Sequence, residues 1–262
     1  MTMLLGYENH VDHADVVLAG GVWTVPLTNL QSPLLSRKAR SSGLLTSSTK
    51  FTIDLGASRA IRMVAITHTN LTSAGQYRIT WYSDAFSTAV GNTGWLAIPG
   101  YPDDDPDGLG ASIFHVFASA TTARYWQVEL DDTANPDNYV EVGRLIMPTT
   151  WEPPYNFDND SNVDAMEPNT PRQDSLGGVG FFNRRTPARV FRFSFGVLPA
   201  AEMEHVRRIR RISNLNRQVV IIPKPDAIDH ERCFVGTLRS MSEISLFGLY
   251  GKTGFEVIES VP

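Results

Sequence analysis

The 262-residue chain has a single cysteine and no long apolar run. Because one thiol cannot form an intramolecular disulfide, the fold does not depend on oxidising conditions. Cys233 lies in the strand-like run RCFVGTL, so we expect a small buried side chain and not a catalytic thiol. No run reaches the roughly 18 apolar residues of a spanning helix, and the first residues lack the pattern of a secretory signal. We therefore expect no membrane insertion.

Motifs of well-known enzyme classes are also absent. The sequence has no G-x-S-x-G elbow, no Walker loop, no dinucleotide-binding fingerprint after a strand and no H-E-x-x-H helix. These absences predict a protein that is not an enzyme. A pair of carboxylates for glycoside hydrolysis needs no local spacing, so a glycan-cleaving enzyme stays open as one alternative function.

The net charge of −5 is unevenly distributed along the chain. Residues 1–165 carry nine Lys and Arg against eighteen Asp and Glu, a net charge of −9, whereas residues 166–262 carry fourteen against ten, a net charge of +4. An acidic part and a mildly basic part predict two units with different neighbours. Neither part is basic enough to predict nucleic-acid binding.

Short strands joined by turns are predicted for most of the chain, which has sixteen Pro and twenty Gly. In FTIDLGASRAIRMVAI, apolar residues alternate from Phe51 to Leu55, and Gly56 marks a turn before a second, more continuously apolar strand. The predicted strands of the first part are Phe51–Leu55, Ile61–Thr67, Tyr77–Tyr82, Trp95–Ile98, Ile113–Phe117, Tyr125–Leu130 and Tyr139–Met147. Spacings of about ten residues are typical of an antiparallel sandwich or jelly roll.

The second part is predicted to be a small α+β unit. Residues 148–180 are rich in Pro, Asn, Asp and Gly without a clean period, which indicates a linker or extended arm. Residues 199–215 form the one convincing helix, with an apolar stripe at Met203, Val206, Ile209 and Ile212. Strands are predicted at Ala188–Leu198, Gln218–Ile222, Cys233–Leu238, Glu243–Leu249 and Gly254–Val261. The predicted domains are residues 1–147, the linker 148–180 and residues 181–262.

Three segments of the first part resemble galactose-binding-like (discoidin-type) jelly rolls. Phe51–Gly56 has the form F-x-hydrophobic-D-L-G, the aliphatic strand Ile61–Thr67 follows it, and Arg124–Leu130 (RYWQVEL) is similar to a late strand of that family. Together with the C-terminal pattern, the expected fold class is mainly β: an N-terminal galactose-binding-like jelly roll and a small C-terminal α+β unit with one main helix. The opening strands then belong to the scaffold.

Other segments resemble tail-tip or baseplate (distal-tail-like) proteins of long-tailed bacteriophages. They are Ala39–Ser42, Thr67–Leu71 (THTNL), Phe191–Phe195 (FRFSF), Ala200–Glu202, Val219–Pro223 (VVIIP) and the turn Pro225–Asp226. The resemblance implies a virion structural protein in the tail tip, assembled in the host cytoplasm. Its partners are expected to be further copies of itself in a ring and other tail proteins, such as the tail tube and hub.

The alternative function is a carbohydrate-binding module that recognises glycans of a host cell surface. Exposed aromatic side chains at the loop tips of a jelly roll can stack on sugar rings. Trp95 and Tyr101 flank a long Pro/Gly/Asp loop and are the predicted sugar-binding residues. The scaffold and lectin functions are compatible, because a tail-tip protein can carry an adhesion domain.

The loop PGYPDDDPDGLGAS is also a candidate calcium site. Its carboxylates, at Asp103, Asp104, Asp105 and Asp107, repel one another unless they are neutralised, and hard cations prefer several oxygen ligands in a flexible loop. A solvated surface loop explains the same pattern. Two weaker metal patterns are H-x-D-H-x-D at His10–Asp15 and an EF-hand-like spacing over Asp158–Asp164, and no other cofactor is expected.

The remaining candidates belong to an interface between subunits. Arg207, Arg208, Arg210 and Arg211 share the predicted helix with interleaved apolar residues. No aromatic side chains accompany them for stacking on bases, which favours a solvated face or a subunit contact over nucleic-acid binding. Trp151 and Tyr155 in the predicted arm are expected to reach a neighbouring copy. Head-to-tail contacts between unlike units can close a ring.

Overall fold

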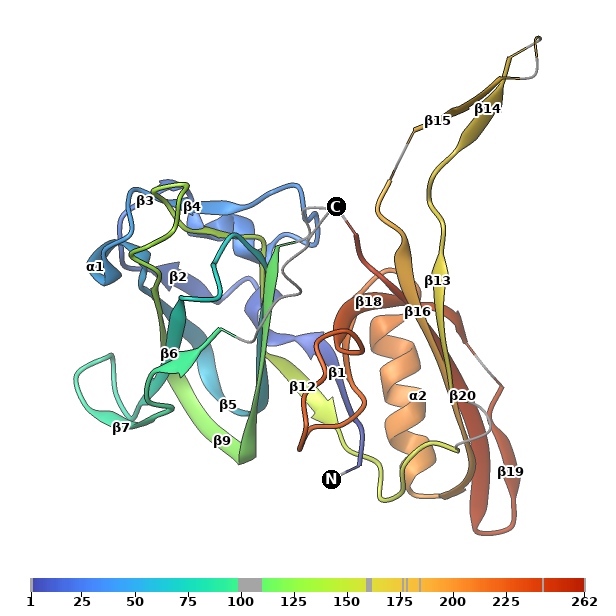
Figure 1. The fold of residues 1–262 in the computed structure, drawn as a ribbon. Helices are drawn as coiled ribbons and strands as arrows, with labels where there is room; N and C mark the ends of the chain where they lie inside the picture. Colours follow the sequence, from blue (N-terminus) through green and yellow to red (C-terminus); the bar gives the residue numbers. More distant parts are fainter. Residues whose placement is uncertain are drawn as a thin grey trace. The chain divides into compact units, whose positions relative to one another are not determined.

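One unit of the chain is inserted into the sequence of another (Figure 1). The computed structural model describes residues 2–98, 110–158, 162–175, 177, 179–183, 185–241 and 243–261. The jelly-roll unit comprises Glu8–Thr150, and the α+β unit comprises Met1–Tyr7 together with Trp151–Pro262. Strands in both units pair antiparallel. The fold is mainly β, as the sequence predicts.

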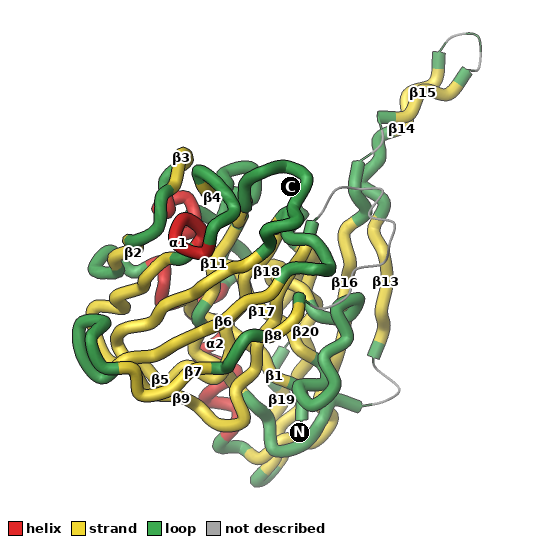
Figure 2. The backbone as a smooth tube through the Cα atoms, turned by 60° about the vertical axis from the view of Figure 1, so that its left-hand side comes forward, coloured by secondary structure: helices red, strands yellow, loops and turns green. Residues whose placement is uncertain are grey.

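Two sheets build the jelly-roll unit (Figure 2). The larger has the order β11-β5-β9-β6-β7, with β2 on β5 and β8 on β6, and the smaller has the order β10-β4-β3. The strands are β2 (Val17–Ala19), β3 (Trp23–Val25), β4 (Ala39–Ser41), β5 (Phe51–Thr69), β6 (Gln76–Tyr82), β7 (Ala89–Asn92), β8 (Leu96–Ala97), β9 (Ala111–Asp131), β10 (Glu141–Val142) and β11 (Arg144–Ile146). The helices are short: η1 (His10–Asp12), η2 (Leu27–Gln31) and α1 (Thr46–Thr49).

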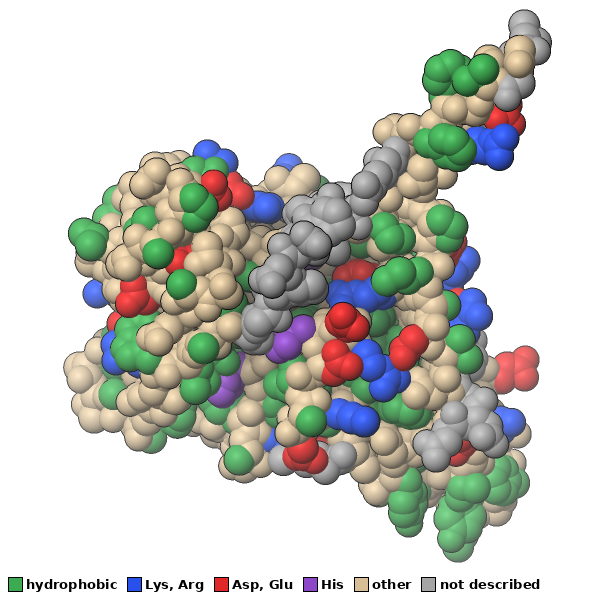
Figure 3. Space-filling model, viewed as in Figure 1, with side chains coloured by type: hydrophobic (Ala, Val, Ile, Leu, Met, Phe, Trp, Pro, Cys, Tyr) green, Lys and Arg blue, Asp and Glu red, His purple; other side chains and the backbone are tan. Residues whose placement is uncertain are grey.

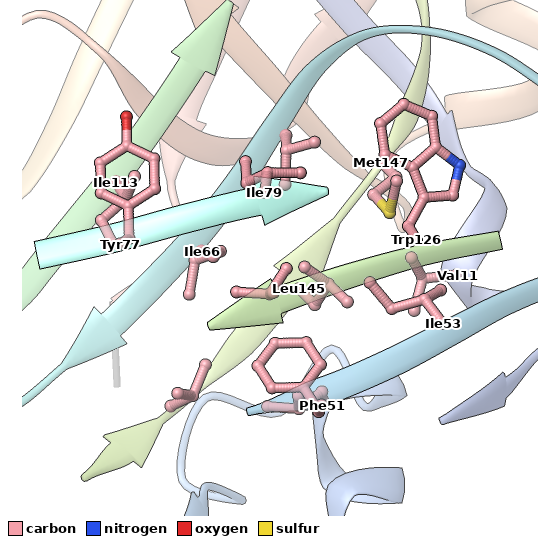
Figure 4. Packing of buried hydrophobic residues seen from close by; sticks show 14 of the residues in the cluster. Val11, Phe51, Ile53, Ile66, Tyr77, Ile79, Ile113, Trp126, Leu145 and Met147 are labelled. Atoms are coloured by element: carbon pink, nitrogen blue, oxygen red, sulfur yellow. The ribbon is translucent and has the colours of Figure 1, made fainter. Parts of the chain in front are cut away.

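A single apolar cluster fills the jelly-roll unit (Figure 4). Phe51 and Ile53 of β5, Trp126 of β9 and Leu145 of β11 are fully buried in it. The alternation read from the sequence therefore places the predicted side of each strand inward. Burying these side chains is the main stabilising contribution of the unit.

β5 is one strand of 19 residues, so the predicted turn at Gly56 is wrong. Gly56 has φ +71°, and its N–H donates to Asp54 Oδ1 at 2.9 Å. The register with β9 shifts between Asp54 and Arg59, which makes a bulge within a strand that continues along the same partner. A Cβ at Gly56 would lie 2.2 Å from Asp15 Oδ2. The two predicted strands both pair with β9 and not with each other.

The α+β unit has one large sheet, in the order β12-β1-β17-β18-β20-β16-β13, with β19 on β20. A separate hairpin is formed by β14 and β15. The strands are β1 (Leu4–Asn9), β12 (Pro148–Trp151), β13 (Val163–Glu167), β14 (Arg172–Asp174), β15 (Gly180–Phe182), β16 (Ala188–Pro199), β17 (Gln218–Ile222), β18 (Phe234–Met241), β19 (Ser245–Phe247) and β20 (Tyr250–Glu259).

Helix α2 (Glu202–Ser213) packs against β16 and β18 of this sheet (Figure 1). Met203, Val206 and Ile209 are fully buried, which confirms the apolar stripe read from the sequence. Pro199 is the last residue of β16 and not part of the first helical turn. None of the helices among the described residues is long and apolar enough to cross a membrane.

The division of the chain differs from the predicted boundaries. β1 belongs to the α+β sheet, where Leu5 lies opposite Ile221, although the sequence prediction assigned it to the jelly roll. Residues 148–180 contain β12, β13 and β14, and Asp164 lies opposite Phe191 of β16. The predicted linker is thus partly sheet. These pairings join residues far apart in the sequence, which a local pattern does not reveal.

The charge balance also changes with this division. The jelly-roll unit has nine Lys and Arg against fourteen Asp and Glu, a net charge of −5, and the α+β unit has fourteen of each, a net charge of zero. The acidic residues between Trp151 and Ala165 offset the basic residues that follow them. The two units therefore do not carry opposite net charges.

Candidate functional site

One face of the large jelly-roll sheet gathers polar and aromatic side chains. Ile79 of β6 and Trp126 of β9 point into the core, so the alternate residues of the two strands lie on the opposite face. We call that face the outer face and define it by Arg78, Thr80 and Tyr82 of β6, by Tyr125, Gln127 and Glu129 of β9, and by Trp95. In the strand register, Arg78 lies opposite Glu129, Thr80 opposite Gln127 and Tyr82 opposite Tyr125.

Two ion pairs hold charged groups at this face. Arg78 Nε lies 2.5 Å from Glu129 Oε2, and Arg124 donates to both carboxylate oxygens of Asp54 at 2.6 and 2.8 Å. The hydrogen bond to Glu129 raises the pKa of Arg78, and the hydrogen bond from Arg124 lowers the pKa of Asp54. Each guanidinium is thus paired with a carboxylate, so these two ion pairs leave no spare charge for an ionic ligand.

Trp95 is held over Arg78 by a short loop. The guanidinium carbon of Arg78 lies 4.7 Å from the centre of the indole ring. Thr93 ties the loop to β6, because its N–H donates to Ile79 O at 3.0 Å and its hydroxyl accepts from Ile79 N at 3.1 Å. Gly94, with φ +69°, makes the turn before Trp95. The indole is 37% exposed, and with Arg78 on one face it offers at most the other face to a ligand.

A second group of rings, formed by Tyr82, Tyr125 and Phe86, lies towards the end of β6. Phe86 packs edge-on against Tyr82 and Tyr125, with centroid distances of 5.7 and 5.2 Å. The Tyr82 hydroxyl donates to Gln127 Oε1 at 3.3 Å, and burial raises the pKa of Tyr82, so the phenol stays neutral. Phe86 has φ +66°, a conformation that costs about 1–3 kcal/mol for a residue with a side chain. Its contacts with the two tyrosines, together with the hydrogen bonds that Asp84 accepts from Ser87 and Thr88, hold the loop in that conformation.

This chemistry suits a neutral, hydroxyl-rich ligand. Aromatic rings present flat apolar surface, while the guanidinium of Arg78 and the amide of Gln127 present donors and acceptors in fixed positions. Thr80 and Glu129 are only 7% exposed beneath their neighbours. A ligand on the outer face would therefore meet the rings together with the guanidinium groups of Arg78 and Arg124, whose side chains are 35% and 42% exposed, whereas Glu129 lies beneath them.

The residues predicted from sequence for sugar and metal binding are only partly within the described structure. Trp95 lies on the outer face, whereas Tyr101 and the aspartates Asp103, Asp104, Asp105 and Asp107 lie outside the described residues. In the H-x-D-H-x-D pattern, Asp12 accepts hydrogen bonds from Arg144 and Asn9. The EF-hand-like pattern includes residues 159–161, which lie outside the described residues. Among the residues that the structure describes, no group of three or more His, Cys, Asp and Glu is placed to hold a metal ion.

The predicted interface residues lie in different environments of the α+β unit. Trp151 is 3% exposed, and its Nε1 donates to Glu202 Oε2 at 2.8 Å. Its indole packs on Phe195 in the core, so the predicted role of Trp151 in a subunit contact is wrong. Tyr155 is exposed. Arg207, Arg208 and Arg211 are exposed and Arg210 is half-buried on α2, and an open hollow is lined by Arg207, Arg210, Arg211 and Asn214.

Sequence reasoning missed most of the outer face. The strands around Tyr82 and Tyr125 are predicted, and their alternation already separates Arg78, Thr80 and Tyr82 from the buried side. The missing information is that β6 pairs with β9, which sets Gln127 and Glu129 beside them. The period of two in both strands could have identified the residues of the outer face, but not how they lie relative to one another.

The sequence matches no protein-family model and no curated protein. Among solved structures, the chain is similar to a GH29 fucosidase of Ruminococcus gnavus in complex with fucose, with 13% identity and a TM-score of 0.41 over 55% of this chain and 27% of that one. It is also similar to the family 32 CBM of NanJ from C. perfringens in complex with galactose, with 13% identity and a TM-score of 0.39 over 54% and 96% of the two chains. A further neighbour is CBM32-6 of GH89 from Clostridium perfringens, with 16% identity and a TM-score of 0.36 over 55% and 99%.

Two of these neighbours are carbohydrate-binding modules, and the third is a fucosidase of which this chain spans about a quarter. At these identities the likeness concerns the jelly-roll fold alone.

Proposed function

We propose that the jelly-roll unit is a carbohydrate-binding module that takes a neutral glycan on its outer face. The observation that supports this proposal is the combination, on one sheet face, of Trp95 and the Tyr82–Tyr125 ring cluster with charged groups that are already paired. Paired charges disfavour an ionic ligand, and rings with planar polar neighbours favour a hydroxylated one. Neither this function nor the second one below requires catalysis.

The test is a titration of the full chain with sugars, followed by calorimetry or by changes in tryptophan fluorescence. Galactose and fucose, the sugars named for the similar solved structures, are the first probes. We expect Trp95→Ala and Tyr125→Ala each to weaken binding about tenfold or more, as loss of a central aromatic contact does at binding sites. The matched control is Tyr155→Ala, which removes an exposed aromatic side chain from the other unit.

Two results would contradict this proposal. The first is a wild-type chain that binds no member of a broad panel of neutral glycans. The second is glycan binding that survives unchanged in both Trp95→Ala and Tyr125→Ala, which would place the site elsewhere. If the Tyr155→Ala control lost glycan binding to the same extent, the substitutions would act by disturbing the fold and not by removing a contact with the glycan.

The second candidate function is a structural subunit of a multi-copy assembly. The observation that favours it is the β14–β15 hairpin of the α+β unit, which carries exposed Phe181 and Phe182 and pairs with no further strand among the described residues. The sequence resemblance indicates a phage tail tip as that assembly, with further copies and other tail proteins as partners. The test is the mass of the full chain by light scattering: a multiple of 29.0 kDa supports a self-assembling subunit, and a monomer at every concentration contradicts it.

A further inference from the structure

The hairpin of β14 and β15 exposes apolar side chains that its own unit does not cover. We call the hairpin and the stalk that leads to it, that is, the described residues between Asn169 and Thr186, the arm. Val179, Phe181 and Phe182 are 59–65% exposed there. The stalk is held by its own hydrogen bonds: Thr170 Oγ1 donates to Arg185 O at 3.2 Å, and Asn169 Nδ2 donates to Thr186 O at 3.1 Å. A two-stranded hairpin with exposed rings is marginal in water unless something packs on it.

A second apolar surface lies at the turn between β19 and β20. We call it the tip and define it by Leu246, Phe247, Leu249 and Tyr250, which are 47–80% exposed. Phe247 pairs with Tyr250 across the turn, where Gly248 has φ +62°. Figure 3 shows hydrophobic side chains gathered both on the arm and over β19.

The arm and the tip lie at opposite ends of β16. The arm enters β16 at Ala188, whereas Pro199 at the other end pairs with Tyr250 of the tip. Twelve residues of strand span about 40 Å, and Figure 1 shows the hairpin and β19 extending in opposite directions from the same sheet. The arm of one copy therefore cannot cover the tip of that same copy.

Together the two surfaces are large enough for a specific contact. Seven side chains with roughly 100 Å² exposed on each amount to roughly 700 Å² of apolar surface. A standard interface buries about 1,200–2,000 Å² in total, of which about 57% is apolar. The apolar area of the arm and the tip thus matches the apolar area of the smallest standard interfaces, and polar residues around the two surfaces would add to the buried area.

We infer that the arm of one copy packs on the tip of a second copy of this chain, in a head-to-tail contact. A contact of this type uses a different surface on each side, so every added copy leaves one arm and one tip free until a ring closes. One interface then covers both the arm and the tip, which an unrelated partner on either surface would not do. The inference rests on the second function proposed above and names its partner and contact surfaces.

The experiment compares the association of full-length variants by light scattering and sedimentation. We expect Phe181→Ser with Phe182→Ser in the arm, and Leu249→Ser with Phe247→Ser in the tip, each to weaken association about tenfold or more. The matched control is Val90→Ser with Val17→Ser, which removes two exposed apolar side chains from the jelly-roll unit. Far-UV circular dichroism checks that the variants are folded, and the exposure of the substituted residues favours this.

Cross-linking between single-cysteine additions then tests the pairing directly. The natural Cys233 is 1% exposed, so it gives little background. Phe181→Cys mixed with Leu249→Cys should form a disulfide-linked dimer, and neither variant should do so alone. A dimer from Phe181→Cys alone would indicate an arm-to-arm contact and overturn the inference.

The outcomes separate this inference from the function on which it rests. A wild-type oligomer that persists in both the arm and the tip variants overturns the arm-to-tip contact but leaves the assembly function standing. A wild-type monomer at all concentrations overturns both. Association lost in the arm and tip variants but kept in the control supports both.

Discussion

His115 of β9 is a half-buried imidazole held against Tyr77. Its Nδ1 lies 3.2 Å from the Tyr77 hydroxyl, and its ring packs on Phe117 at 4.6 Å between centroids. Burial lowers the pKa of His115 to about 4 and raises that of Tyr77 to about 12. Both side chains are therefore neutral in the folded protein near neutral pH.

The lowered pKa of His115 predicts a loss of stability in mild acid. Between pH 6.5 and about 4 the unfolded chain binds a proton at His115 that the folded chain does not. The free energy of unfolding therefore falls as the pH falls through this range, by at most about 3 kcal/mol for this group. Urea unfolding at a series of pH values measures the slope. In His115→Phe the slope between these values should become smaller, and an unchanged slope would contradict the assignment.

Arg144 of β11 is the most buried ion-paired cation among the described residues. Its side chain is 1% exposed and donates to Leu30 O at 2.9 Å and to Asp12 Oδ2 at 2.6 Å. Removing it leaves the Leu30 carbonyl unpaired, whereas Asp12, at 38% exposure, can regain water. Arg144→Met should therefore destabilise the protein by about 1–3 kcal/mol.

Arg172→Met is the matched control, because Arg172 and its partner Asp174 are both exposed. It should change the free energy of unfolding by less than about 1 kcal/mol. Denaturant unfolding of the two variants measures the difference. If the two substitutions changed the free energy of unfolding equally, burial of the Arg144 pair would contribute nothing to stability.

At the scale of elements, the arm differs from helix α2 in how it joins the fold. Within the part of the chain that the structure describes, β14 and β15 pair only with each other, and their side chains are exposed or half-buried. In α2, Ile209 is fully buried in the cluster that also contains Phe193 and Val219. The helix is therefore part of the core of the α+β unit, and the arm is not.

Replacing residues 171–185 by a short Gly/Ser turn should leave the unfolding free energy of the monomeric chain nearly unchanged. Ile209→Ala, by contrast, should cost about 2–5 kcal/mol, because it opens a cavity in a packed core. Guanidinium unfolding at low protein concentration measures both. A large loss on removing the arm would show that it contributes to the fold of its own unit.

At the scale of the whole molecule, the jelly-roll unit is an insertion whose two ends meet. His10 N donates to Met147 O at 3.1 Å, and Met147 N donates to Asn9 Oδ1 at 2.8 Å. Each unit has its own apolar cluster. Adjacent ends and a separate core are what allow a domain to be inserted without disturbing its host.

This arrangement predicts that residues 8–150 fold when expressed alone. We expect a cooperative thermal transition and dispersed amide signals in NMR for the fragment. The complementary chain, in which a short linker replaces residues 8–150, should fold as well. A fragment without a cooperative transition would show that the jelly roll depends on the α+β unit.

The sequence by itself determined the local pattern of both units. Alternating residues such as Phe51 and Ile53 select a strand with one buried side, and the spacing of Met203, Val206 and Ile209 selects a helix with one buried stripe. These periods act over a few residues, so they can be read from the chain without a partner. Trp126 in the core and the mainly β fold class follow from them.

Only the tertiary structure decided which segments meet. Long-range pairing puts β1 beside β17, makes one bulged strand of β5, and sets Gln127 beside Tyr82 on the outer face. The tertiary structure also buries Trp151 in a core, although the sequence around Trp151 is typical of an exposed linker. Strand pairing is chosen by the burial of whole faces, and that free energy depends on residues more than a hundred positions apart.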